Sequence, residues 1–191
     1  MLGKLLIPVL LLSSSLLLAA ADSTKTAEMP KHGFIGATAC GMCHHTDKQG
    51  KQLEIWQNSK HATAYKTLQT DEANKIAKDK GFTTAAAETP ECLKCHAPAY
   101  NVDKSMLGPK YNIADGVQCE TCHGGGADYK MLSIMKDKEK AVANGLVMHD
   151  DLKTFCVTCH NSESPTFKAD PAIDINAMWD KIKHPIPQDA K

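Results

Sequence analysis

The sequence contains no arginine, so all 22 of its basic side chains are lysines, and they are balanced by 22 acidic ones. Arginine supplies the planar hydrogen-bonding fork that phosphate and base recognition favours. The formal net charge is zero, and no basic stripe runs along the chain. Lys136, Lys138 and Lys140 fit a solvated helix face better than a patch that pairs with haem propionates or steers a partner. These absences indicate that nucleic acid is not a partner.

Large side chains for a core are also scarce, because aromatic residues make up only 5% of the chain and only two of them are tryptophan. A chain of this length is large enough for one compact domain. With so few large apolar side chains, its core needs another apolar body.

Only one long apolar run is present, and it lies at the N-terminus. Lys4 precedes the apolar stretch Leu5 to Leu18, and three small residues, Ala19 to Ala21, follow it. This pattern is typical of a secretory signal peptide over residues 1–21. The stretch is shorter than the roughly 20 residues of a spanning helix. We therefore expect a periplasmic or extracellular protein with no stable membrane insertion after cleavage, a flexible lead-in over 22–38 and a single domain over 39–191.

All eight cysteines fall in four Cys-x-x-Cys-His motifs, so none remains for a disulfide or a free thiol. This motif is the attachment signature of c-type haem: two thiols bond the haem vinyl groups and the histidine ligates the iron. The sequence thus predicts four covalently bound haem c groups. The attachment residues are Cys40, Cys43, Cys92, Cys95, Cys119, Cys122, Cys156 and Cys159, and the iron ligands are His44, His96, His123 and His160.

Zinc ribbons use the same cysteine spacing, and an exported chain can form disulfides. Neither alternative explains a histidine after every second cysteine. With 9 histidines in 191 residues, four such placements arise by chance about once in 10⁵.

The apolar periodicity predicts helices over about 53–68, from Asp71 to Gly81, over 130–144, after Asp150 or Asp151, and from about 174 to 183. No segment alternates as a strand does. The motifs begin at residues 40, 92, 119 and 156, at unequal intervals, which argues against a short tandem repeat. We predict a mainly α multihaem cytochrome c, with short helices and long loops wrapped around four haems and little or no β structure.

Each iron also has a distal position, for which histidine, methionine or an open site are the options. The histidines outside the motifs are His32, His45, His61, His149 and His184, and Met131, Met135 and Met148 compete with them. His61 and His184 stand in helical contexts near Trp56 and Trp179. His45 directly follows a motif histidine and cannot serve the same iron. His32 serves as an internal ligand or as one donated to a neighbouring subunit.

The chain resembles the tetrahaem cytochrome c554 family over nearly the whole mature sequence. The resemblance is carried by Phe34-Ile35-Gly36, the Trp56 to Ala62 segment, Gly116 to Gly124, Ser164-Pro165 and the terminal helix that ends in His184. It implies a helical fold with closely stacked haem pairs, His61 as the partner of His160 and His184 as the partner of His123. It also implies an open iron at His96. The family places the distal histidine of the first haem shortly after the third motif, where this chain has none before His149.

Electron relay is the leading hypothesis, with exported redox proteins as partners and a role in nitrogen-compound or other respiratory chains. A second hypothesis is an enzyme that reduces nitric oxide at an open second haem, so the residues leave enzymatic activity undecided. A third is a filament subunit that self-associates through haem edges or a donated histidine such as His32.

We expect the haem-free chain to lack a stable fold, because porphyrin supplies most of the predicted core. Circular dichroism of the haem-free chain should show no cooperative thermal transition. A cooperative melt would contradict this expectation.

Overall fold

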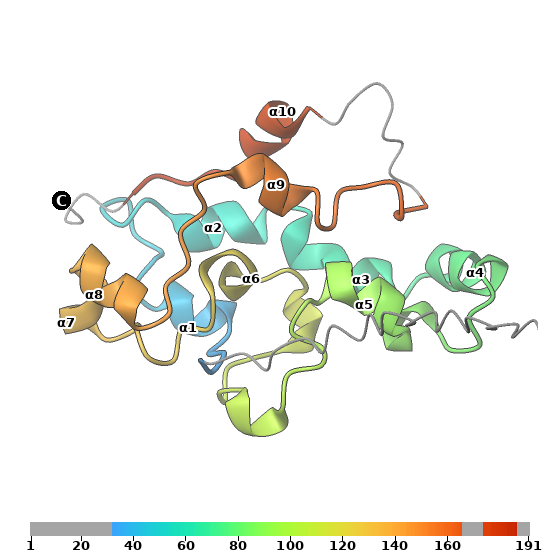
Figure 1. Ribbon diagram of the computed structural model, residues 1–191, viewed down its shortest axis with the longest axis horizontal. Coiled ribbons are helices and arrows are strands. Elements are labelled where there is room, and N and C mark those ends of the chain that lie inside the picture. Colours follow the sequence, from blue (N-terminus) through green and yellow to red (C-terminus); the bar gives the residue numbers. More distant parts are fainter. Residues whose placement is uncertain (1–31, 166–173, 187–191) are drawn as a thin grey trace, which may run out of the picture.

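The computed structural model describes residues 32–165 and 174–186, and Figure 1 shows them as short helices joined by long loops. The predicted signal segment, 1–21, and the first part of the lead-in, 22–31, lie outside these residues. Within the described residues, no helix combines the length and apolar character needed to cross a bilayer.

The described helices are short, and the longest, α4, has nine residues. The α-helices are α1 (Ala37–Gly41), α2 (Gln52–Gln57), α3 (Ala64–Thr67), α4 (Asp71–Asp79), α5 (Pro90–His96), α6 (Cys119–His123), α7 (Leu132–Met135), α8 (Lys138–Ala143), α9 (Leu152–Cys156) and α10 (Ile175–Trp179). Single 3₁₀ turns are η1 (His61–Thr63), η2 (Ala86–Glu88), η3 (Lys104–Met106) and η4 (Ile113–Asp115). In the described part, β structure amounts to one isolated bridge between Phe34 and Leu107. The predicted mainly α class is confirmed.

Side-chain caps decide where several of these helices begin. Asp137, Asp151 and Asp174 each accept the backbone N–H three residues ahead, at the starts of α8, α9 and α10. Such caps satisfy donors that have no partner inside the helix. The helix predicted from Asp71 is capped one residue earlier, by Thr70, whose hydroxyl accepts the Ala73 N–H at 3.2 Å. Asp71 instead lies in the first turn, where a negative charge favours the helix dipole.

The single helix expected over 53–68 is broken into α2, η1 and α3. Ser59 donates its hydroxyl to the Trp56 carbonyl at 2.7 Å, which gives the backbone an alternative to the helical ladder. The His61 carbonyl accepts a hydrogen bond at 3.0 Å from the N–H of Val117, which belongs to another part of the chain. Tertiary hydrogen bonds therefore override the helical periodicity here.

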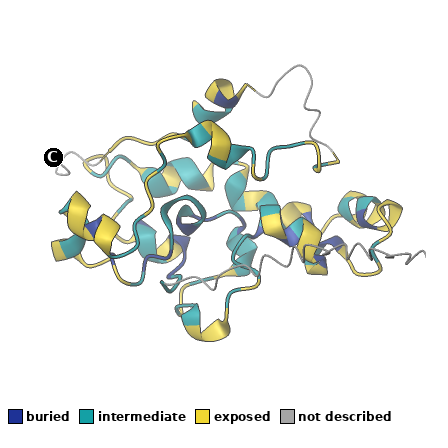
Figure 2. Cartoon of the chain, in the orientation of Figure 1, coloured by how far each residue is buried: buried dark blue, intermediate teal, exposed yellow. Residues whose placement is uncertain are grey.

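Few apolar side chains of the described residues are buried, and half of those are alanines. The main cluster joins Leu68, Ala77, Ala86, Leu93 and Ala97, around α4, η2 and α5. The largest side chain with under 2% exposure is that of Thr89. Figure 2 shows the buried residues scattered in short stretches over several elements. The polypeptide by itself supplies only a small core.

Buried polar side chains fix the segment before α1. The Glu120 carboxylate, on α6, accepts the N–H groups of Ile35 at 2.7 Å, Gly36 at 2.8 Å and Gly126 at 2.7 Å. Gln118 accepts the Ala37 N–H at 2.8 Å. Residues 32–38, expected to belong to a flexible lead-in, are therefore packed against the third motif. The sequence pattern missed this because the partners of these backbone groups lie more than 80 residues away.

Replacing Glu120 with glutamine should lower the free energy of unfolding by about 2–4 kcal/mol. Glu120 is 3% exposed, and a glutamine amide has one oxygen to offer and turns an NH₂ toward N–H donors. Denaturant unfolding of the haem-loaded protein, followed by circular dichroism, measures the change. The exposed Glu91, in the first turn of α5, is the matched control, and its change to glutamine should cost less than about 0.5 kcal/mol. Equal losses in the two variants would contradict the role of Glu120.

Candidate functional site

Each Cys-x-x-Cys-His motif lies on one helical turn. α5 and α6 contain the second and third motifs, and the first and fourth begin inside α1 and α9. The first and fourth continue the helical pattern, since the His44 N–H bonds the Cys40 carbonyl at 3.1 Å and the His160 N–H bonds the Cys156 carbonyl at 2.9 Å. Residues at i, i+3 and i+4 share one face of a helix. The two thiols and the imidazole of a motif therefore project toward the same side.

Thiols of different motifs meet across the fold. The Cys40 thiol contacts that of Cys119, and this contact raises the pKa of Cys40 and lowers that of Cys119. Burial, together with the neighbouring Cys159, raises the pKa of Cys95 to about 11. The first motif is thus adjacent to the third, and the second to the fourth.

Cys122 connects these two pairs. Burial, followed by the proximity of Cys156, raises the pKa of its thiol to about 11. The four motifs consequently form a continuous series in the order first, third, fourth, second. All eight cysteines are free thiols, so the disulfide alternative is not realised in the structure. Among the described residues, no three His, Cys, Asp or Glu side chains group around one metal position.

Two motif histidines face histidines from distant parts of the chain. The ring centroids of His61 and His160 are 6.1 Å apart, and those of His123 and His184 are 5.8 Å apart. Two imidazoles on opposite sides of one metal, each about 2 Å from it, have centroids roughly 6 Å apart. The structure therefore brings together the two pairs that the resemblance named, at a spacing that suits a shared iron.

Three of the four paired histidines have a pKa that favours the form that binds metal. Burial, and then the nearby ring of His160, lowers the pKa of His61. Burial, and then His184, lowers the pKa of His123. Burial also lowers the pKa of His160. A lowered pKa keeps an imidazole neutral at neutral pH, and the neutral ring is the one with a lone pair for a metal.

The other two motif histidines have different surroundings. Nδ1 of His96 lies 2.8 Å from the Ala64 carbonyl. Since a carbonyl can only accept, Nδ1 carries the proton, and Nε2 is left with a free lone pair. Burial lowers the pKa of His44, and His184 lowers it further, so His184 lies near the first site as well as the third.

The remaining candidate histidines are engaged elsewhere. His149 donates Nε2 to the Cys122 carbonyl at 2.7 Å, and its ring packs on Phe155 at 4.1 Å between centroids. Nε2 of His149 is therefore unavailable to an iron. His32 donates Nδ1 to Asp128 at 2.6 Å. Nδ1 of His45 lies 2.9 Å from the Gly41 carbonyl.

The competing methionines lie mainly at the surface of the described structure. Met131 is 59% exposed and Met148 is 52% exposed, while Met135 is half-buried. The role of these three methionines as iron ligands stays a hypothesis.

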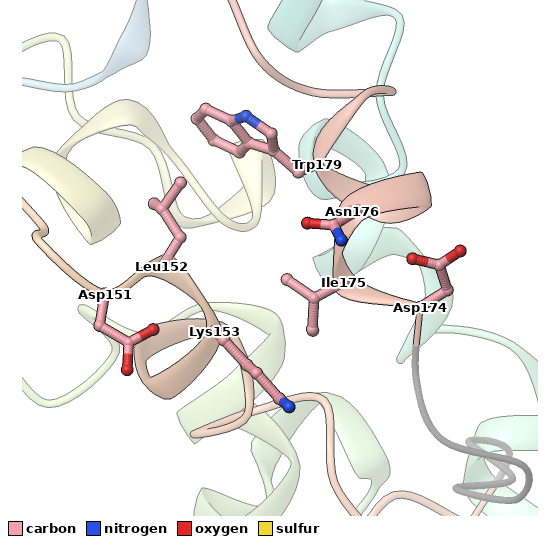
Figure 3. Close-up of a pocket in the computed structure, with 7 residues that line it drawn as sticks. All are labelled: Asp151, Leu152, Lys153, Asp174, Ile175, Asn176 and Trp179. Carbon is pink, nitrogen blue, oxygen red and sulfur yellow. The ribbon is translucent and has the colours of Figure 1, made fainter.

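A cavity of about 320 Å³ lies between α9, which leads into the fourth motif, and α10, which precedes His184. Figure 3 shows Leu152, Ile175 and Trp179 around this space, with Asp151 and Asp174 at its margins. Both carboxylates cap their helices, accepting the N–H groups three residues ahead. The lining is mixed, because Lys153 and Asn176 join the two carboxylates and the three apolar side chains.

Sequence reasoning missed several contacts that position the motifs. The Ala64 carbonyl orients His96, and a backbone carbonyl gives no sequence signal. Lys94, inside the second motif, forms an ion pair at 2.6 Å with Glu163, just after the fourth. That contact lowers the pKa of Glu163 and links the two motif segments at the surface. Glu120 also lies inside a motif, but only its burial reveals its role.

The donor set fits haem c. Each motif presents two thiols and an imidazole on one helical face, and two motif imidazoles have a second imidazole opposite them. The thiols would hold the porphyrin edge and the imidazoles would hold the iron.

Comparisons with known proteins give three matches. The family model described as "Cytochrome c554 and c-prime" matches residues 39–124. Cytochrome c-554 of Nitrosomonas europaea is 26% identical over 132 residues, which are 66% of this chain and 52% of the relative. The chain thus spans about half the length of that curated relative. The solved structure of reduced cytochrome c554 from the same organism aligns with a TM-score of 0.47 and 21% identity, over 80% of this chain and 79% of the other.

The residues that the family model matches include the first three motifs. Residues 39–124 thus resemble the cytochrome c554 family, and the curated relative is a cytochrome, which supports covalently bound haem c at these motifs.

Proposed function

We propose that the protein is an exported tetrahaem c-type cytochrome that relays electrons between redox partners. The observation that carries the proposal is the contiguity of the four motifs, through the contacts of Cys40 with Cys119 and of Cys95 with Cys159 and the proximity of Cys122 to Cys156. Motifs in contact hold their cofactors as neighbours, as electron transfer through a series requires. When bound, haem supplies the one-electron chemistry.

The chain's own residues contribute attachment, orientation and electrostatics. The thiols fix each ring to a helical turn, and the motif histidines fix the irons. His61 and His184 are the proposed second ligands of the fourth and third irons. Because axial ligands and burial set the potential of a haem, the four sites differ in potential. The surroundings of His96 and His44 are unlike those of the paired histidines, so the series is not made of equivalent steps.

The proposed partners are other exported redox proteins, with a place in nitrogen-compound or other respiratory chains. The balanced surface charge, with lysines and carboxylates interspersed, suits a weak and transient encounter. The curated relative's name identifies a cytochrome and no partner, so the donor and the acceptor are left open.

Purified protein should carry four haems and pass electrons without a substrate. Its mass should exceed that of the mature chain by four haem groups, and changing both cysteines of one motif to serine should remove one. After chemical reduction, it should reduce an oxidised soluble c-type cytochrome in a single-phase or multiphase stopped-flow trace. Fewer haems would contradict the tetrahaem assignment. A high-spin signal that shifts with nitric oxide, together with steady consumption of nitric oxide, would favour an enzyme.

Replacing His184 with alanine should convert one low-spin haem to high-spin and shift its potential by on the order of 100 mV, because an axial imidazole is lost. Electron paramagnetic resonance and a redox titration measure both effects. Replacing His149 with alanine is the control, since Nε2 of His149 is bound to the Cys122 carbonyl. The control should keep the wild-type number of low-spin haems. A new high-spin haem in the His149 variant would identify His149 as a ligand and contradict our assignment.

A further inference from the structure

The turn from His61 to Ala64 touches three of the four motif regions. η1 and α3 form this turn, and Figure 1 shows α3 beside α5, the helix of the second motif. The His61 ring faces that of His160 in the fourth motif, at 6.1 Å between centroids. Three residues later, the Ala64 carbonyl accepts Nδ1–H of His96 in the second motif, at 2.8 Å. One short backbone segment therefore carries contacts to two proposed iron sites.

The same turn is anchored to the segment that leads into the third motif. The His61 carbonyl accepts the Val117 N–H at 3.0 Å, and the Val117 carbonyl accepts Nε1–H of Trp56 at 2.8 Å. Gly116 packs against the turn with φ +67°. A Cβ there would lie 2.6 Å from the His61 oxygen and 3.1 Å from the Ala64 nitrogen. The backbone at 116–117 thus fixes the position of the turn relative to the segment that leads into the third motif.

The contact to His96 is of the kind that tunes a metal ligand. A carbonyl that accepts the second ring N–H of a ligating histidine fixes the tautomer and the ring orientation and makes the ligand more basic. The hydrogen bond to His96 depends on the position of the Ala64 carbonyl. That carbonyl cannot move independently of His61, because only two residues separate them.

We propose that the His61–Ala64 turn is a positioning element shared by the second and fourth haem sites, so that one backbone adjustment sets the properties of both. The proposal rests on the proposed function, since it takes His96 and His61 as iron ligands. A displacement of the turn lengthens the His96 hydrogen bond and moves the His61 ring relative to His160. Loss of the hydrogen bond makes His96 a weaker electron donor, which favours the reduced iron and raises the potential of the second haem.

The test is Gly116→Ala in the haem-loaded protein, because its methyl group meets the backbone of the turn. We expect the reduction equilibrium of the second haem to change about tenfold, which is about 59 mV upward for a one-electron couple. The paramagnetic signal of the fourth haem should shift as well, and the first haem should stay as in the wild type. A His96→Met variant identifies the signal of the second haem, and His160→Met identifies that of the fourth.

Gly81→Ala is the matched control. Gly81 also has a positive φ, +88°, but a Cβ there meets nothing within 4 Å. It carries the same backbone strain without touching the turn, and should leave all four haems unchanged. If Gly116→Ala does not yield folded protein, His61→Met tests the turn, because it keeps an iron ligand while changing its length. The second haem should then shift together with the fourth.

A shift confined to the fourth haem, in Gly116→Ala or in His61→Met, would overturn the proposal, as would equal shifts of all four haems. Either outcome leaves four working haems and so leaves the proposed function standing. Protein that binds no haem would instead contradict the proposed function itself. The two failures are therefore distinguishable from the haem count of the same samples.

Discussion

The arrangement of this chain depends on a buried carboxylate. Glu120 lies inside the third Cys-x-x-Cys-His motif and accepts backbone N–H groups of Ile35, Gly36 and Gly126. The buried apolar residues of the described part are few, and half of them are alanines, so apolar packing gives this segment little support. A charged acceptor with three donors replaces that packing. It joins the segment before the first motif to the third motif, and so brings the first and third attachment sites together.

The rest of the structure follows the same principle, in which polar groups with defined partners position elements too short to be stable alone. Helices of four to nine residues are below the length at which isolated helices persist in water. Aspartate and threonine caps define several starts, and the Trp56 indole and Gly116 hold the turn that bears His61. A hydrogen bond has a preferred direction, whereas an apolar contact does not. Hydrogen bonds therefore restrict the position of a side chain more closely than apolar contacts do. That suits a scaffold whose task is to present thiols and imidazoles.

The sequence predicts the attachment chemistry well and the packing poorly. The motifs, the helical class and the helix from residue 71 follow from local patterns, and the pairs of His61 with His160 and His123 with His184 follow from the family resemblance. The break in the helix expected over 53–68, the packing of residues 32–38 and the hydrogen bond of His149 to Cys122 do not. In each case the deciding partner lies far along the chain, and a backbone carbonyl or N–H often provides it. Backbone groups are nearly the same in every residue, so the sequence of side chains does not reveal which of them will form a tertiary hydrogen bond.

The four sites differ because the chain treats their histidines differently, even though the motifs look alike. His123 and His160 each have a second imidazole opposite, whereas His96 has a carbonyl on Nδ1. A second imidazole acts directly on the metal, and a carbonyl acts through the basicity of the first ligand. A chain with identical motifs can therefore build sites of unequal potential by changing only what surrounds each histidine. In the proposed series, unequal potentials would favour one site over another for the electron. The second site, at one end of the series, differs from its neighbour, the fourth, in what its histidine contacts.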